Sequence, residues 1–163
     1  MILEIQVMDE FAYNRDKKQI KNIAYFLGYA GALPFLVLSL IVVLANEPFS
    51  IIGKSALHLY GAIILSFLGG LHWGRIASQS QISSSDRWVL IYSVFPSLIG
   101  WSSYLLNGIW RESVCILITG FVLAYWIDRS FVKSGKWSQF MGPLRLNLTI
   151  VACISLGLSY LAK

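Results

Sequence analysis

Four ionisable side chains in or beside long apolar segments are the residues of this sequence most able to take part in chemistry. They are His72, Arg75, Asp128 and Arg145. An imidazole and a carboxylate at one depth of a membrane could take up and release protons, or could hold the headgroup of a quinone or an anionic substrate. A structural role is favoured, because a carboxylate one turn inside a bilayer is costly unless it is paired. An ion pair of Asp128 with Arg75 or Arg145, hydrogen-bonded to His72, would meet that need.

A second histidine, His58, lies on the same apolar segment as His72, roughly 21 Å away along a helix axis. Two stacked haems could use that spacing, but the chain has only two histidines, so bis-histidine ligation would require a dimer. Haem and quinone are therefore minor alternatives, and no cofactor is the main expectation. Motifs for metal binding and for nucleophilic catalysis, such as HExxH and CxxC, are absent from the sequence. The sequence predicts no catalytic or metal-binding residue and favours a non-enzymatic protein, while an enzymatic activity stays open.

Long apolar segments must position these side chains. The sequence is 56% hydrophobic and 13% charged, against roughly 25% charged for an average soluble domain. Its charges separate apolar blocks of the length that a bilayer requires. We therefore expect an all-α, polytopic integral membrane helical bundle. About five transmembrane helices are predicted, at residues 23–45, 56–76, 88–107, 111–132 and 144–162.

The basic residues predict how this bundle is oriented. With five spans, ten Lys and Arg residues fall on the side of the N-terminus and three on the other side. The positive-inside rule then places the N-terminus in the cytoplasm and the C-terminus outside. Residues 1–22 are expected to be a cytoplasmic tail without a cleaved targeting signal, loosely ordered in preference to an interfacial helix, and residues 23–163 to be one transmembrane domain. The positive charge forms no stripe with interleaved aromatic residues, so nucleic acid is not an expected partner.

Small residues and prolines mark the expected helix contacts. The second span has small residues at helical spacing, and the first span offers a matching small face: Ala62, Ser66, Gly69, Gly70 and Gly74 in the second, Gly28 and Ala32 in the first. Such residues allow two backbones to approach closely, either within one chain or in a homodimer. Pro34 and Pro96 lie inside spans and should kink them, which could open a cavity.

Three motifs resemble a known family. They are YGAIILSFLGGLHWG at residues 60–74, FPSLIGW at residues 95–101 and YWIDRS around Asp128. Together they resemble the membrane family known as domain of unknown function 3429, which is transmembrane protein 69-like. The resemblance covers most of the chain and implies a compact multi-span membrane domain, but it names no reaction. It adds Ser97 to the candidate polar pocket of His72, Arg75, Asp128 and Arg145.

The sequence thus favours a small multi-span membrane protein with a structural, accessory or assembly role in a membrane complex. Its expected partners are the lipid bilayer and other membrane proteins or a second copy of itself. The alternative is a transporter or a proton-coupled, quinone-binding protein that uses a cytoplasmic-side pocket around His72 and Asp128. Acidic residues near the N-terminus favour the bacterial inner membrane as its location.

Overall fold

Helices account for every regular element in the residues that the structure describes. This computed structural model describes residues 2–80, 83–84, 86–106 and 108–162, with the side chains of residues 2–12 left out. Its helices are α1 (Ile2–Leu44), α2 (Phe49–Ala77), α3 (Asp86–Leu105), α4 (Trp110–Lys133) and α5 (Met141–Leu161). Each of the five contains a stretch long and apolar enough to cross a membrane. The predicted all-α, five-span fold is confirmed.

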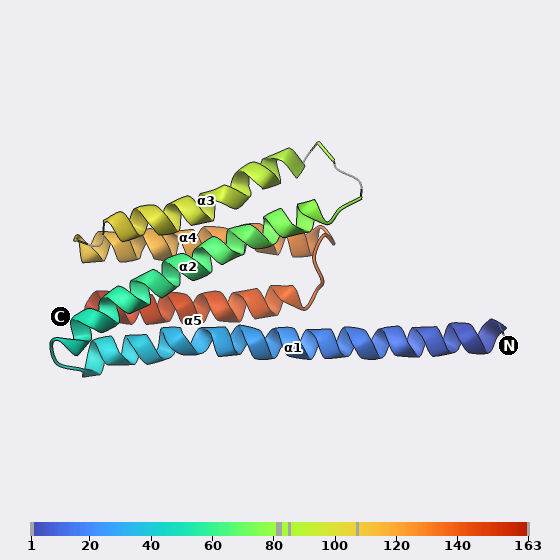
Figure 1. Cartoon of the computed structure of the whole chain (residues 1–163), viewed down its shortest axis with the longest axis horizontal. Coiled ribbons are helices and arrows are strands. Elements are labelled where there is room, and N and C mark those ends of the chain that lie inside the picture. Colours follow the sequence, from blue (N-terminus) through green and yellow to red (C-terminus); the bar gives the residue numbers. More distant parts are fainter. Residues whose placement is uncertain (1, 81–82, 85, 107, 163) are drawn as a thin grey trace.

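The helix α2 is central to the bundle, because it contacts each of the other four helices. On one side of it α1 packs against α2 and α5, and on the other side α3 packs against α2 and α4. Figure 1 shows α1 running along the edge of the bundle and continuing well beyond it toward the N-terminus. The two ends of the chain lie at opposite ends of the long axis, as an odd number of crossings requires (Figure 1).

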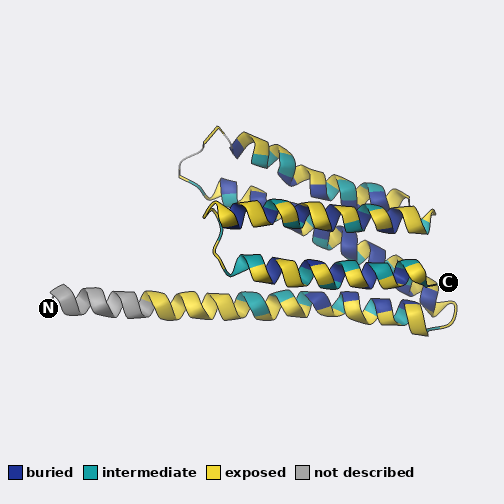
Figure 2. Cartoon of the chain, turned by 180° about the vertical axis from the view of Figure 1, so that it is seen from behind, coloured by how far each residue is buried: buried dark blue, intermediate teal, exposed yellow. Residues whose placement is uncertain are grey.

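Large apolar side chains cover the outer surface of this bundle. Phe26 is 73% exposed, Phe67 59% and Leu161 75%. Figure 2 shows how exposed and buried positions alternate along the helices inside the bundle, so that one face of each points inward and another outward. A protein with an apolar outer surface of this extent would aggregate in water, but the same surface is suited to contact with lipid chains.

All five helices begin before the predicted spans, and two of them begin well before. The first helix begins at Ile2 instead of residue 23, so the backbone of the expected tail is helical and continues into the first span. Polar residues that favour helices, such as Lys17 and Lys18, can extend a helix that the apolar span has already nucleated. The second helix begins at Phe49 instead of residue 56, since a lysine near a helix end can reach the headgroup region from inside the span. The side chains on which an interfacial helix over residues 1–13 would depend lie outside the described part, except for Tyr13.

Backbone contact between α2 and α3 depends on two glycines. A Cβ atom at Gly69 would overlap with the carbonyl oxygen of Ser93, and one at Gly100 would lie 2.9 Å from the carbonyl oxygen of Ala62. Only a hydrogen atom fits at either position. Dispersion and close backbone approach are the main attractions between helices in lipid, so these contacts hold α3 on α2.

The remaining small residues do not form the face that the sequence predicts. A Cβ atom added at Gly70 or at Gly74 would have no neighbouring atom within 4 Å, and both residues are exposed. Residues spaced by four advance about 40° around a helix at each step, so the strip winds away from α3. The expected match between Gly28 and this strip is wrong, because Gly28 faces Leu144 and Leu148 of α5 instead. The other members of the set, Ser66 and Ala32, are half-buried and buried, respectively.

Both prolines of the spans lie inside continuous helices. Pro34 is within α1 and Pro96 is within α3, and each helix continues on both sides. Pro96 is buried and its Cβ would lie 3.4 Å from a Cβ at Gly69, so it forms part of the α2–α3 contact. A kink at either position stays a prediction.

The substitution Gly69→Ala should destabilise the bundle, because the added methyl group cannot fit without separating α2 from α3. Overpacking of this kind costs roughly 1–3 kcal/mol. The neighbouring Gly70→Ala is a matched control: its methyl group meets open space, and alanine favours a helix by about 1 kcal/mol over glycine. Thermal unfolding in detergent should therefore show a lower midpoint for Gly69→Ala and an equal or higher one for Gly70→Ala. Equal midpoints for the two variants would contradict the packing described here.

Candidate functional site

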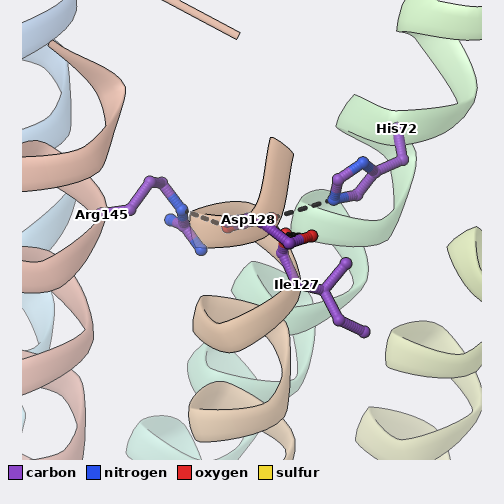
Figure 3. Close-up of polar contacts among 5 residues, drawn as sticks. His72, Ile127, Asp128 and Arg145 are labelled. Atoms are coloured by element: carbon purple, nitrogen blue, oxygen red, sulfur yellow. Dashed lines mark hydrogen bonds and ion pairs between the residues drawn. The ribbon is translucent and has the colours of Figure 1, made fainter. Parts of the chain in front are cut away.

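A buried triad joins three helices near the end of the bundle where α4 ends and α5 begins. His72 comes from α2, Asp128 from α4 and Arg145 from α5 (Figure 3). Arg145 Nε donates a hydrogen bond of 2.6 Å to Asp128 Oδ2, and His72 Nε2 lies 2.9 Å from Asp128 Oδ1. Because an ionised carboxylate only accepts, the proton of a neutral His72 is assigned to Nε2. Each carboxylate oxygen therefore has a donor from a different helix.

The triad is closed to solvent. His72 is 0% exposed, Asp128 1% and Arg145 6%. The charges of Asp128 and Arg145 compensate each other, which is the condition under which two ionised groups persist in a low-dielectric interior. This arrangement ties α2, α4 and α5 together and offers no carboxylate oxygen to a soluble substrate.

Aromatic rings surround the imidazole of His72. The ring of Trp137 stacks on it with centroids 4.9 Å apart and an interplanar angle of 14°. Tyr92 and Phe131 approach it from two further directions, at 5.4 Å and 4.8 Å. Its second nitrogen, Nδ1, is buried and has no hydrogen-bond partner. Apolar rings therefore close the site on the side away from Asp128.

The end of α4 explains how Trp137 reaches this position. Gly135 has a φ of +71°, a left-handed conformation that glycine adopts without strain. The backbone N–H groups of Lys136 and Trp137 both donate to the carbonyl of Phe131, at 3.0 Å and 3.2 Å. This helix-ending motif reverses the chain so that Trp137 folds back over His72. From sequence Trp137 resembles an interfacial anchor, and Gly135 is the signal in the sequence that could have indicated the turn.

The structure brings together three of the five residues predicted to form a polar pocket: His72, Asp128 and Arg145. Arg75 belongs to a different ion pair, so the alternative pairing of Asp128 with Arg75 is wrong. Ser97 is half-buried on α3, whereas the triad is built from α2, α4 and α5.

The partner of Arg75 is Asp86, the first residue of α3, with 3.5 Å between Arg75 Nη2 and Asp86 Oδ1. Asp86 is 4% exposed and also accepts a hydrogen bond of 2.8 Å from the backbone N–H of Ser83. The guanidinium of Arg75 lies over the ring of Phe131, 4.9 Å from its centroid. The short connection between α2 and α3 brings Asp86 close to Arg75, and a carboxylate at a helix N-terminus is itself stabilised by the helix dipole.

The other histidine, His58, lies fully buried in α2 toward the opposite end of the bundle. Its Nε2 lies 3.1 Å from Ser103 Oγ and its Nδ1 lies 3.4 Å from Ser113 Oγ. With a hydroxyl beside each ring nitrogen, His58 joins α2 to α3 and α4 and presents no free nitrogen to a haem iron. Within the described residues no group of three or more His, Cys, Asp or Glu could hold a metal ion.

The fold and the buried triad together define a polytopic helical membrane protein. The profile of the family described as "Protein of unknown function (DUF3429)" matches residues 20–161, and the chain belongs to this family. The predicted resemblance is thereby confirmed.

Two curated relatives carry the name "Transmembrane protein 69". The protein of Xenopus tropicalis is 30% identical over 133 residues, which are 82% of this chain and 51% of that protein. The protein of Mus musculus is 28% identical over 132 residues, which are 81% of this chain and 53% of that protein. The chain thus spans about half the length of these relatives. No solved structure matches the chain significantly.

The substitution Asp128→Asn should strongly destabilise the protein, because it leaves the guanidinium of Arg145 buried without an anion. Breaking a buried pair in this way costs about 3–5 kcal/mol. The free energy of unfolding in detergent, followed by denaturant titration, measures the loss. A matched control is Asp16→Asn, which removes an exposed ion pair with Arg15 and should have almost no effect.

The double substitution Asp128→Leu with Arg145→Met should recover most of the stability lost in Asp128→Asn, since it removes both charges and keeps apolar volume. An Asp128→Asn protein as stable as Asp16→Asn would show that the triad does not hold the helices together.

Proposed function

We propose that this chain is a structural or accessory component of a larger membrane complex. The observation that carries the proposal is the part of α1 that extends past the bundle (Figure 1). Residues 13–23 are all exposed. The α4–α5 connection at residues 137–140 lies beside Asn14, Lys17, Lys18 and Lys21 across an open hollow and buries none of them. A polar helical segment with so little packed surface is only marginally stable by itself. A second protein packed along it would supply further contacts.

The charge of this extension suggests what the partner presents. Within residues 13–23 the basic residues outnumber the acidic ones: they are Arg15, Lys17, Lys18 and Lys21 against Asp16. Two lysines also lie over tyrosine rings one helical turn away, Lys17 over Tyr13 at 5.8 Å and Lys21 over Tyr25 at 5.9 Å. An acidic surface on a neighbouring subunit complements this segment.

The closed triad supports an accessory role over the alternative of a transporter or proton-coupled protein. A site that exchanges protons or solutes with the cytoplasm needs access to water, and His72 and Asp128 are 0% and 1% exposed. Both oxygens of Asp128 are already used by donors from the same chain. The carboxylate of Asp128 is thus accounted for by helix packing.

We also infer that the N-terminus lies in the cytoplasm and the C-terminus outside. The excess of Lys and Arg on the N-terminal side supports this orientation. The opposite positions of the two chain ends in Figure 1 fit an odd number of crossings. The bacterial inner membrane stays a prediction for the membrane itself.

A reporter fused after Lys163 tests the orientation. Alkaline phosphatase, which matures only outside the cytoplasm, should be active in this fusion, and green fluorescent protein, which matures in the cytoplasm, should be dark. A fusion truncated after Gln79, beyond α2, is the matched control and should give the reverse pattern. A fluorescent C-terminal fusion would mean that one span does not cross.

Purification from native membranes in mild detergent tests the accessory role. A photoreactive amino acid in place of Lys18 should give one defined protein adduct, and the partner should copurify in a fixed molar ratio. The same photoreactive residue in place of Leu158, which is 44% exposed on α5, should react mainly with lipid. Replacing Lys17, Lys18 and Lys21 together with Gln should weaken copurification while leaving the thermal stability of the bundle unchanged. A chain that purifies alone and forms no adduct from position 18 would refute the proposal.

A further inference from the structure

A pocket of about 200 Å³ lies beside the triad, enclosed by α1, α2, α4 and α5. Apolar side chains make up most of its wall, including the aromatic rings of Phe35, Phe67 and Phe121. Two polar residues, Arg145 and Thr149, contribute to the wall from α5. Phe67 is 59% exposed, so the pocket opens at the lipid-facing surface and not toward water.

The two polar residues of the wall have unused hydrogen-bonding groups. Arg145 points its Nε at Asp128, but its Nη2 is buried without a hydrogen-bond partner. The hydroxyl oxygen of Thr149 is also buried without a partner. The residues are 6% and 7% exposed and are four positions apart, hence on one face of α5. Unpaired groups of this kind are rare in proteins because each costs roughly 1–3 kcal/mol.

The charge balance restricts what can satisfy these groups. Asp128 lies 2.6 Å from Arg145 and compensates its positive charge. An anionic ligand would bring a second negative charge into a low-dielectric site without a cation of its own. A neutral ligand oxygen, such as a carbonyl, can accept from Arg145 and Thr149 without this cost.

The shape of the pocket restricts the ligand further. Pockets for whole drug-sized molecules measure roughly 300–1,000 Å³, so this one holds only a small headgroup. Gly31 of α1 leaves room for it, since a Cβ there would meet only the Tyr60 hydroxyl oxygen, at 3.9 Å. Flat rings pack favourably against the aromatic wall.

We propose that this pocket binds the headgroup of a neutral, lipid-soluble carbonyl compound of the quinone type. The ring lies among the three phenylalanines, a carbonyl oxygen accepts from Arg145 Nη2 and from the Thr149 hydroxyl, and the apolar tail extends into the bilayer. The binding site shares Arg145 with the triad but lies on the side of α1, away from His72, and it adds a ligand to the accessory role without depending on it. The quinone is bound in this pocket without being oxidised or reduced.

The experiment measures binding of tritiated decylubiquinone to the full chain in lipid nanodiscs, with unlabelled competitors. Unlabelled decylubiquinone should compete with a single saturable site, whereas dodecane, which lacks an oxygen, and decanoate, which is anionic, should not compete at equal concentration. Thr149→Val keeps the volume and removes the hydroxyl, so it should weaken binding about two- to thirteenfold, the loss of one hydrogen bond of about 0.5–1.5 kcal/mol.

Gly31→Leu should abolish binding, because its side chain fills the pocket. Gly70→Leu is the matched control, an identical change on α2 where a Cβ meets open space, and should bind normally. If Gly31→Leu does not fold, Thr149→Val by itself still tests whether this pocket binds the headgroup. Displacement by dodecane or decanoate as strong as by decylubiquinone, or unchanged binding in Thr149→Val, would overturn the proposal. The copurification experiment is independent of both results, so either proposal can fail alone.

Discussion

The pairing of Asp128 with Arg145 is the constraint on which the rest of this structure depends. In a bilayer, apolar packing gives helices little directional preference, because lipid chains are as apolar as leucine side chains. A buried carboxylate does impose a direction, since it must meet a cation and hydrogen-bond donors at short range. Arg145 and His72 meet Asp128 from two sides, at 2.6 Å and 2.9 Å. These two contacts therefore restrict how α2, α4 and α5 can be rotated and shifted relative to one another.

The outer helices attach to this frame by different means. Helix α3 is held by backbone approach at Gly69 and Gly100, where no side chain separates it from α2. Helix α1 packs through side chains, with Phe35 in the buried apolar core, and is linked further by single hydrogen bonds, such as the one of 2.7 Å from the Tyr60 hydroxyl to the carbonyl of Gly31. A second, of 3.0 Å, runs from the Asn147 side-chain amide to the Tyr29 hydroxyl. The α1 side of the bundle thus carries the pocket beside Arg145, whereas backbone contact holds α3 on α2.

One arginine thereby serves two purposes. Its Nε completes the ion pair that holds the helices, and its Nη2 is left without a partner beside the pocket. A structural network and a ligand site can share a residue because a guanidinium has five N–H donors in a fixed plane. The extension of α1 is a separate surface. A subunit that packs against a neighbour through α1 and holds an amphiphile next to α5 is consistent with both proposals.

The sequence by itself determined the class of fold and the approximate depth of its charges. Apolar blocks of bilayer length predict five helices, and the position of Asp128 within its block predicts that it needs a partner from the same level. The choice of Arg145 over Arg75 was decided only by tertiary structure, as were the turn at Gly135 that brings Trp137 onto His72 and the separation of Gly70 from the α2–α3 contact. The physical reason is that a sequence encodes how deep a residue lies along its helix, but the direction in which it faces depends on how the helix is rotated against its neighbours. That rotation is set jointly by all contacts of the bundle.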